Sequence, residues 1–527
     1  MPYNKTNSHK ILLAVIVLAV LFMGVLLFIA PPAVFPDPAM GFQVMRSMQL
    51  GGGFNIFTSP DQGDISQNYS DFLTWWSPGQ YLVPYLFKWI TNLNTGQVIA
   101  IVITICQLLG LAGFYVFFRK IGFTGLTSAL SLVFIICQQA FVVPYVFYNG
   151  GEVLLFAFEG WFLYGCATLK KPGLKLILFV LLAGWLGFFF KSSFLWIYAA
   201  GLCCLWTRLS ANLTGIWTWI KKGLWIAIPA IIAILCIHLF YLSKGQNPTS
   251  SAEGIKLTMQ TFGFPLASPV LSGFSADDLL HGLLFHTGTP FFNDTWSIAI
   301  LVLFAIASLW LVFVIVRKVP DNNYRLFVVV FYLAAVLIFS LAYLRQLAIS
   351  YEARHFRIIG LLLAPGIIYL AGRSKSGYRS GVALLIAGIG FTSVIYVAKG
   401  YRFNKNTSAR GITGIAQPNI DQKSLNQVMK LDRENKDAIF VFVSNDIGLE
   451  IQHNRIITLQ PIGADLKINL DEYVYKGFAG PLYIVLPESY AGPKEKLIMK
   501  SFPGYAGFNL SMLSDNYVLY AAKMKRK

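Results

Sequence analysis

Long runs of apolar residues, separated by short polar loops, recur through residues 1–400. The first run contains no charged residue and is about 20 residues long, enough to cross a hydrocarbon core about 30 Å thick. Hydropathy predicts about eleven such spans. Their expected bounds are Ile11–Ala30, Gln97–Phe118, Thr124–Val143, Val153–Leu169, Leu174–Phe190, Phe194–Trp206, Leu224–Leu242, Trp296–Val316, Leu326–Leu344, Ile358–Ala371 and Ser380–Ala398. The pattern predicts a polytopic α-helical membrane protein, whose first run is an uncleaved signal anchor because no small-residue cleavage site follows it.

The pattern changes from about Tyr401 onward. Short β-branched or alternating runs are typical of strands, and polar amphipathic segments between them are typical of helices. The predicted strands are Ala438–Val443, Arg455–Leu459, Pro481–Leu486 and Tyr517–Ala521, and Ser424–Glu434 is a predicted helix. We therefore expect a transmembrane domain over residues 1–400 and a C-terminal extracytoplasmic α/β domain over residues 401–527.

The charged residues of the loops separate by sign from one loop to the next. Cytoplasmic loops carry an excess of Lys and Arg, so the basic set is assigned to the inside. That set includes Lys10, Arg119, Lys120, Lys170, Lys171, Lys175, Arg208, Lys221, Lys222, Arg317, Lys318, Arg325, Arg373, Lys375 and Arg379. The acidic set comprises Asp37, Asp61, Asp64, Asp71, Glu152, Asp277, Asp278 and Asp294. An odd number of spans with an inside N-terminus places the C-terminal domain outside.

Composition narrows the class of protein. The chain is 56% hydrophobic and 13% charged, which a soluble protein of 527 residues could not accommodate. The net charge of +18 follows from the basic loops and does not indicate nucleic-acid binding. The six cysteines all lie in apolar runs, as small buried residues do. Their absence from the C-terminal domain favours a bacterial cytoplasmic (inner) membrane.

Two predicted outer loops are long, residues 31–94 and residues 243–295. The first contains amphipathic stretches, Ala39–Leu50 and Tyr81–Ile90, that we expect to lie along the membrane surface. Between them, Trp75 and Trp76 fit either an interfacial aromatic belt or a platform on which a sugar ring stacks.

Ionisable residues gather at the predicted outer ends of the spans. Each could be a snorkelling side chain or a structural ion pair, but together they place carboxylates and cations on one membrane face. Transfer of a sugar from a phosphate-linked lipid needs a carboxylate that takes the acceptor's proton and cations that stabilise the departing phosphate. The residues concerned are Asp37, Glu152, Lys191, Arg345, Glu352, Arg354, His355 and Arg357.

Several of these segments resemble motifs of the GT-C glycosyltransferases, polytopic enzymes that use polyprenyl-phosphate sugars, of the protein-mannosyltransferase and aminoarabinose-transferase types. Pro36-Asp37-Pro38 with Arg46 resembles the acidic first outer loop and the Arg-bearing helix after it. Ser77-Pro78-Gly79-Gln80-Tyr81-Leu82 resembles the turn that leads into a jaw helix. Glu152 resembles the acid of the second outer loop. The stretch 183–191 resembles the segment whose Lys meets the donor phosphate, and 351–355 resembles the Arg-bearing segment before a late span.

The resemblance implies an inverting glycosyltransferase that moves a sugar from a polyprenyl-phosphate donor to an acceptor on the outer face of the membrane. Asp37 is the expected catalytic base. The expected donor-phosphate ligands are Lys191, Arg354, Arg357 and His355. Glu152, Arg46, Trp75, Trp76 and Tyr81 are expected to position substrates, with Arg46 paired to a loop carboxylate or the donor phosphate.

No cofactor is expected. Pro38 stands where the family usually has a second acid, which favours a metal-free mechanism over a divalent metal site. The expected partners are the lipid bilayer, the polyprenyl-phosphate sugar and an acceptor that is a protein, a lipid or a glycan.

Two other functions fit the same sequence. A transporter or flippase for a lipid-linked sugar would need no base but would need charge near the bilayer midplane, where Glu159 is the candidate. A non-enzymatic membrane scaffold would bind partners through the C-terminal domain. Replacing Asp37 distinguishes the enzyme from both.

Overall fold

A computed structural model gives the fold. It describes residues 8–34, 36–138, 141, 150–211, 214–245, 254–274, 293–347, 349, 352–406, 409–474, 476 and 479–525. The predicted outer acids Asp277 and Asp278, Tyr351, and part of the predicted span Thr124–Val143 lie outside these residues.

Each predicted span falls on a helix. These helices are α1 (Ser8–Ile29), α4 (Thr95–Lys120), α5 (Gly125–Ile136), α7 (Glu152–Thr168), α8 (Leu174–Phe190), α9 (Phe194–Ser210), α10 (Ile216–Phe240), α13 (Asp294–Lys318), α14 (Asn322–Leu344), α15 (Arg357–Arg373) and α16 (Ser376–Asn406). In the described parts of the chain, seven candidate spans are long and apolar enough to cross a membrane, and α5, α8 and α9 are shorter apolar helices. The exact number of spans therefore stays a prediction.

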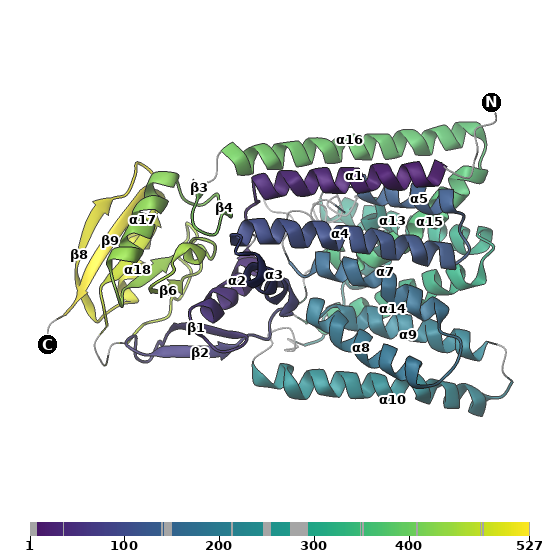
Figure 1. The fold of residues 1–527 in the computed structure, drawn as a ribbon, viewed down its shortest axis with the longest axis horizontal. Coiled ribbons are helices and arrows are strands. Elements are labelled where there is room, and N and C mark those ends of the chain that lie inside the picture. Colours follow the sequence, from purple (N-terminus) through teal and green to yellow (C-terminus); the bar gives the residue numbers. More distant parts are fainter. Residues whose placement is uncertain are drawn as a thin grey trace.

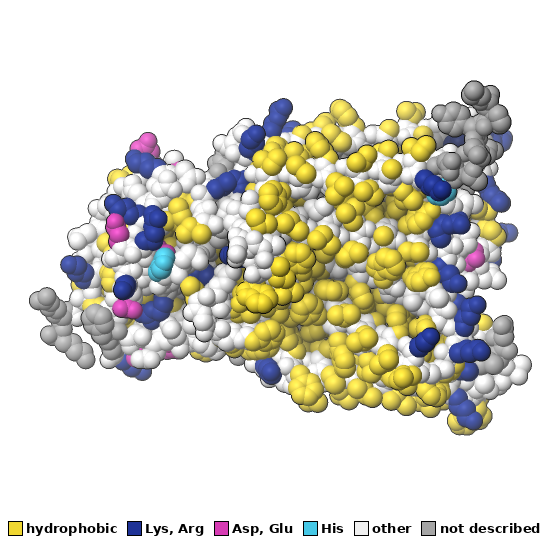
Figure 2. Space-filling view, viewed as in Figure 1, with side chains coloured by type: hydrophobic (Ala, Val, Ile, Leu, Met, Phe, Trp, Pro, Cys, Tyr) yellow, Lys and Arg dark blue, Asp and Glu magenta, His cyan; other side chains and the backbone are white. Residues whose placement is uncertain are grey.

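The helices form a bundle whose outer surface is apolar. Leu18 and Phe22 on α1 are each 65% exposed, and apolar side chains cover the face of the bundle seen in Figure 2. Lipid rather than water must cover so much apolar surface. The protein is an integral membrane protein.

Small residues bring the central helices α4 and α7 together. A Cβ placed on Gly160 of α7 would overlap the backbone of Gly113 and Phe114 on α4. The rings of Phe114 and Phe156 stack beside this contact, with centroids 5.4 Å apart. Close backbone approach at small residues is the usual basis of helix association in membranes.

Two shorter helices lie at one end of the bundle, where the amphipathic stretches were predicted: α2 (Pro36–Gln49) and α3 (Gly79–Thr91). Between them an antiparallel hairpin, β1 (Ile56–Pro60) with β2 (Asn68–Phe72), replaces the polar loop that the sequence indicated. The second predicted loop contains η2 (Leu242–Lys244), α11 (Met259–Leu271) and η4 (Ser272–Phe274). Helix α11 is no surface loop, because Phe264 is 1% exposed within the bundle.

The C-terminal part contains a five-stranded sheet of order β6-β5-β7-β9-β8, formed by β5 (Ile439–Phe442), β6 (Arg455–Thr458), β7 (Leu482–Pro487), β8 (Tyr505–Met512) and β9 (Tyr517–Met524). Strands β6 and β7 pair parallel with β5, and β9 pairs antiparallel with β7 and β8. The other elements are β3 (Ala409–Arg410), β4 (Ala416–Gln417), α17 (Gln422–Glu434), η6 (Ile447–Glu450), η7 (Glu488–Tyr490) and α18 (Pro493–Lys500). The predicted strands and helix are confirmed.

The sheet, the hairpin, α2 and α3 lie at one end of the bundle, and the N-terminus lies at the other (Figure 1). Lys and Arg side chains gather along that other end in Figure 2. The bundle therefore has a basic end and an end that carries the sheet, the hairpin, α2 and α3.

Replacing Gly160 with Ala should separate α4 and α7 and lower the free energy of unfolding by about 1–3 kcal/mol, because the added methyl group meets backbone. Gly388→Ala on α16 is the matched control, since no atom lies within 4 Å of its added Cβ. Thermal unfolding in detergent compares the two. Equal stability of the two variants would contradict this packing.

Candidate active site

A cluster of ion pairs joins three segments that are distant in sequence. Lys191 Nζ lies 2.7 Å from Glu152 Oε1, and Arg354 Nη1 lies 3.6 Å from the same oxygen. Arg354 Nε also pairs with Glu352. Glu152 begins α7, Lys191 follows the last residue of α8, and Arg354 lies in η5 (Ala353–Phe356), which leads into α15. The structure thus brings Glu152, Lys191 and Arg354 together, as their charges at the span ends suggested.

Burial makes this cluster energetically important. The Glu152 side chain is 5% exposed, whereas those of Lys191 and Arg354 are 21% and 22% exposed. A carboxylate removed from water must be paired, and loss of either partner leaves a buried charge. The two cations retain an open side through which an anionic ligand can reach them.

Several buried polar atoms at this end have no hydrogen-bond partner among the described residues. They are Glu152 Oε2, His355 Nε2, Ser77 Oγ and Gln80 Nε2. The His355 ring lies against Phe339, with centroids 5.6 Å apart. Native proteins leave few buried polar atoms unpaired, so such a group indicates ordered water or a polar ligand. Ser77 and Gln80 have no predicted role beyond belonging to the motif of residues 77–82.

Close contacts connect this cluster to α2. A Cβ on Gly41 of α2 would lie 2.7 Å from Gln80 Nε2, and one on Gly79 of α3 would lie 2.6 Å from the carbonyl oxygen of Phe189, near Lys191. The first residues of α3 therefore pack between α2 and the end of α8. Asp37 and Lys191 lie at the same end of the bundle.

Asp37 stands in the first turn of α2, and its side chain is exposed. That it shares one cavity with the ion cluster stays a prediction. Arg357 begins α15 and lines a small pocket with Gln138 and Ser272, which has a volume of about 20 Å³ and room for about one water molecule.

The three aromatic residues predicted to position substrates, Tyr81, Trp75 and Trp76, differ in their exposure to solvent. Tyr81 is 0% exposed and its hydroxyl donates to Asn55 Oδ1, so it packs within the protein. Its role in positioning a substrate stays a prediction. Trp75 is 40% exposed, and its ring centroid lies 5.8 Å from that of the partly buried Trp76. The carbonyl of Trp76 accepts a hydrogen bond of 3.0 Å from the Tyr241 hydroxyl. Trp75 is the better placed of the two for an external ligand.

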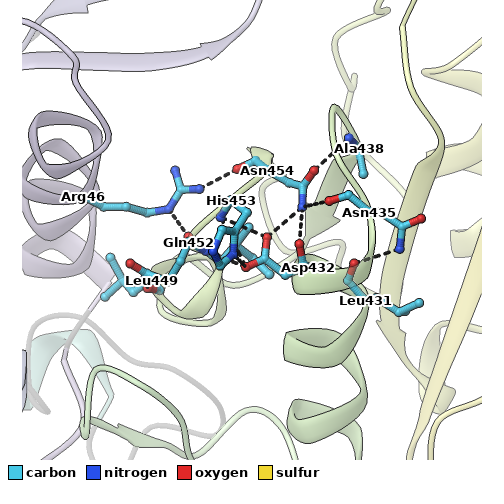
Figure 3. Close-up of polar contacts among 10 residues, drawn as sticks. Arg46, Leu431, Asp432, Asn435, Ala438, Leu449, Gln452, His453 and Asn454 are labelled. Atoms are coloured by element: carbon cyan, nitrogen blue, oxygen red, sulfur yellow. Dashed lines mark hydrogen bonds and ion pairs between the residues drawn. The ribbon is translucent and has the colours of Figure 1, made fainter.

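Arg46 contacts the C-terminal domain, and its predicted pairing with a loop carboxylate or the donor phosphate stays a prediction. It is 5% exposed, and its guanidinium donates to the carbonyl oxygens of Ile451 and, at 2.6 Å, Asn454 in the C-terminal domain (Figure 3). Burial lowers the pKa of Arg46 to about 10, while the charge of Asp432 raises it. The side chain stays protonated at neutral pH and joins α2 to the sheet domain.

Asp432 organises the loop that receives Arg46. Its carboxylate accepts from the backbone N–H of Gln452 at 2.8 Å, from Asn454 Nδ2 at 2.9 Å, and contacts His453 Nδ1 at 3.1 Å (Figure 3). These bonds turn the carbonyls of this loop toward α2. The sequence could not reveal this role, because the partners are about 400 residues apart.

Further contacts join the first outer loop to the C-terminal domain. Ile65 N–H donates to the Val474 carbonyl at 2.8 Å, and Val474 N–H donates to the Gln62 carbonyl at 2.8 Å. Gln43 Nε2 donates to the Asn445 carbonyl at 2.8 Å. The sheet domain is therefore held against the first outer loop by backbone and side-chain bonds.

Within the described residues, no group of three or more His, Cys, Asp or Glu side chains is placed to hold a metal ion. Metal dependence stays a prediction.

Comparison with solved structures shows that the chain shares its fold with two proteins of known structure. The chain is similar to ArnT from Cupriavidus metallidurans bound to undecaprenyl phosphate, at 12% identity and a TM-score of 0.50 over 98% of both chains. It is similar to arabinofuranosyltransferase AftD from mycobacteria at 12% identity and a TM-score of 0.50, covering 98% of this chain and 40% of AftD. No protein-family model and no curated protein sequence matches the chain.

Glu152→Gln and Lys191→Met should each destabilise the protein, and the double variant should lose less than their sum. We expect a coupling of about 1–3 kcal/mol, because loss of Lys191 takes the closer of two cations from the buried Glu152 carboxylate and loss of Glu152 takes the carboxylate from Lys191. Chemical unfolding measures this cycle. The same cycle on the exposed pair Lys430 and Glu434, 3.7 Å apart on α17, should give about 0.5 kcal/mol or less. Equal coupling in both cycles would contradict the importance of burial.

Arg46→Met should loosen the C-terminal domain by about 2–3 kcal/mol, because two carbonyls lose a charged donor. Limited proteolysis should then cut between the two parts faster than in the parent protein. Arg433→Met, at an exposed position on α17, is the control and should cut at the parent rate. Unchanged proteolysis of Arg46→Met would refute this anchoring role.

Proposed function

We propose that the protein is an inverting glycosyltransferase that moves a sugar from a polyprenyl-phosphate donor to an acceptor at the outer face of the membrane. The observation that carries the proposal is the buried cluster of Glu152, Lys191 and Arg354, beside which several buried polar atoms lack a hydrogen-bond partner among the described residues. The fold, shared with glycosyltransferases, supports it. The undecaprenyl phosphate bound to ArnT supports a donor of the same chemical class here.

Lys191 and Arg354 would hold the donor phosphate. Their partly exposed side chains supply positive charge at the membrane boundary, and charge-assisted hydrogen bonds to phosphate are strong. Glu152 would orient both cations from its buried position. The unpaired Nε2 of His355 can donate to a phosphate or sugar oxygen, and Arg357 stands next to the cluster in sequence.

Asp37 would act as the base. Its carboxylate takes the proton of the acceptor hydroxyl, and the oxygen attacks the anomeric carbon of the sugar. The bond from that carbon to the phosphate oxygen breaks, and the polyprenyl phosphate leaves with the electron pair. A single displacement inverts the anomeric centre. Negative charge develops on the leaving phosphate in the transition state. Cations placed beside that phosphate therefore lower the activation barrier of sugar transfer.

The location of these residues suits a lipid-linked donor. Helix α3 carries Trp89 and Ile90, which are 75% and 65% exposed beside the site's end of the bundle. Such exposed aromatic and aliphatic residues lie at membrane boundaries. Trp75, also exposed at this end, would stack on a sugar ring.

The basic end of the bundle would face the cytoplasm, following the positive-inside rule. This orientation puts the N-terminus inside and the C-terminal domain outside, in a bacterial inner membrane. We propose a mechanism without a metal ion, because Pro38 follows Asp37 where a second acid would complete a pair. The acceptor is a protein, a lipid or a glycan.

The transporter alternative rests on Glu159, which is 4% exposed within α7. A buried carboxylate in a span is unusual and often functional. It lies about two helical turns from Glu152 on the same helix. Flipping without transfer, measured by sugar exposure in vesicles, would favour this alternative over the enzyme.

Asp37→Asn should lower the rate of sugar transfer by about 10²–10⁴-fold while leaving donor binding unchanged, because an amide cannot take the acceptor's proton. Thermal unfolding checks that the variant keeps its fold. Transfer to a membrane extract is measured with radiolabelled polyprenyl-phosphate sugars. Asp61→Asn, in the loop of the hairpin, is the control and should keep the parent rate. An unchanged transfer rate in Asp37→Asn would show that Asp37 is not the base. Inhibition of transfer by metal chelators would separately contradict the metal-free mechanism.

Lys191→Met and Arg354→Met should each weaken binding of undecaprenyl phosphate by about tenfold, the loss of one charge-assisted contact. A photoreactive polyprenyl-phosphate probe measures the binding. Lys88→Met is the control, because the Lys88 ammonium on α3 bonds to Thr95 and stands outside the cluster. Equal labelling of all three variants would place the phosphate elsewhere.

A further inference from the structure

Helices α8 and α10 pack against each other in the bundle. Near their last turns they are close, because a Cβ on Gly184 would lie 3.0 Å from the Ala233 Cβ and the rings of Phe188 and Tyr241 lie 5.4 Å apart. Pro229 interrupts α10 between these contacts and its start.

A groove of about 510 Å³ opens between the first half of α8 and α10. Ile177 and Leu181 of α8 form one wall, and Leu224, Ile228 and Ile232 of α10 form the other. Ligand pockets in proteins commonly occupy about 300–1,000 Å³, so the groove is large enough for a chain of a lipid. Helix α10, which forms one wall of the groove, lies along one edge of the bundle in Figure 1.

The walls face the membrane. Leu224 is 48% exposed, Ile228 is 53% exposed and Ile232 is 45% exposed, and all are apolar. A groove with such walls cannot stay filled with water beside lipid. A hydrocarbon chain is the occupant that matches its polarity and its open side.

A positive charge at one end of the groove favours a lipid with an anionic headgroup. Among the residues that line the groove, Lys221 is the charged one, and it stands near the start of α10 with Trp225 one turn further on. This is the basic end of the bundle, where the headgroups of the membrane lie. Basic pockets between spans on the cytoplasmic side attract anionic lipid headgroups.

We propose that this groove binds an anionic phospholipid, with one acyl chain between α8 and α10 and the phosphate on Lys221. The site lies at the opposite end of the bundle from the ion cluster of Glu152. The proposal is independent of the proposed transferase activity, because it needs neither Asp37 nor a sugar donor.

The test uses the purified full-length protein in detergent, titrated with phosphatidylglycerol or with phosphatidylcholine of the same acyl chains. Native mass spectrometry counts bound lipid, and thermal unfolding reports the stabilisation. Phosphatidylglycerol should bind about fivefold more tightly and should raise the melting temperature more. Equal binding of the two lipids would overturn the proposal and leave an unselective boundary lipid.

Two variants locate the site. Lys221→Gln should abolish the preference for phosphatidylglycerol, whereas Lys222→Gln should keep it, because the next residue points about 100° away around the helix. Ile228→Trp should fill the groove and reduce binding of both lipids. If Lys221→Gln and Lys222→Gln reduced the preference for phosphatidylglycerol equally, the preference would come from general surface charge, and the proposed site would be refuted. Displacement of phosphatidylglycerol by undecaprenyl phosphate would assign the groove to the donor lipid instead.

Discussion

The buried carboxylate of Glu152 constrains the end of the bundle at which the proposed chemistry takes place. A carboxylate with 5% exposure requires positive partners, and it finds them in Lys191 after α8 and Arg354 before α15. One side chain therefore fixes the relative positions of three helix ends. The same pairing arranges two cations side by side with open faces, which is the arrangement that a phosphate group requires.

A second interaction joins α2 to the C-terminal domain. Arg46, near the end of α2, donates to carbonyls of the loop that Asp432 organises in the C-terminal domain. Asp37 stands in the first turn of the same helix. Docking of the sheet domain thus fixes the helix that carries the proposed base. In this account the C-terminal domain contributes to the site through α2 as well as by any contact with an acceptor.

The hydropathy pattern predicted the helices and the central strands, because burial in lipid or in a two-sided core requires continuous apolar runs. Strand β8 was missed since it is an edge strand with mostly exposed residues, including Leu510 at 57%. Helix α11 was missed because Pro265 and Pro269 interrupt it, although it is buried.

The sequence indicates which site residues come together when their charges require pairing, but it does not indicate which residues tertiary packing buries. Glu152, Lys191 and Arg354 are costly at span ends unless they meet, so their convergence followed from the sequence. Arg46 and Tyr81 look equally functional in the sequence, yet long-range contacts bury both. Such contacts join residues separated by hundreds of positions, and no local pattern encodes them.

A cryo-electron microscopy structure of the protein with undecaprenyl phosphate tests the central claim most directly. The account predicts density for the phosphate within hydrogen-bonding distance of Lys191 Nζ and the Arg354 guanidinium, in a cavity that Asp37 also faces. Phosphate density remote from both cations, or a wall of protein between that cavity and Asp37, would contradict it.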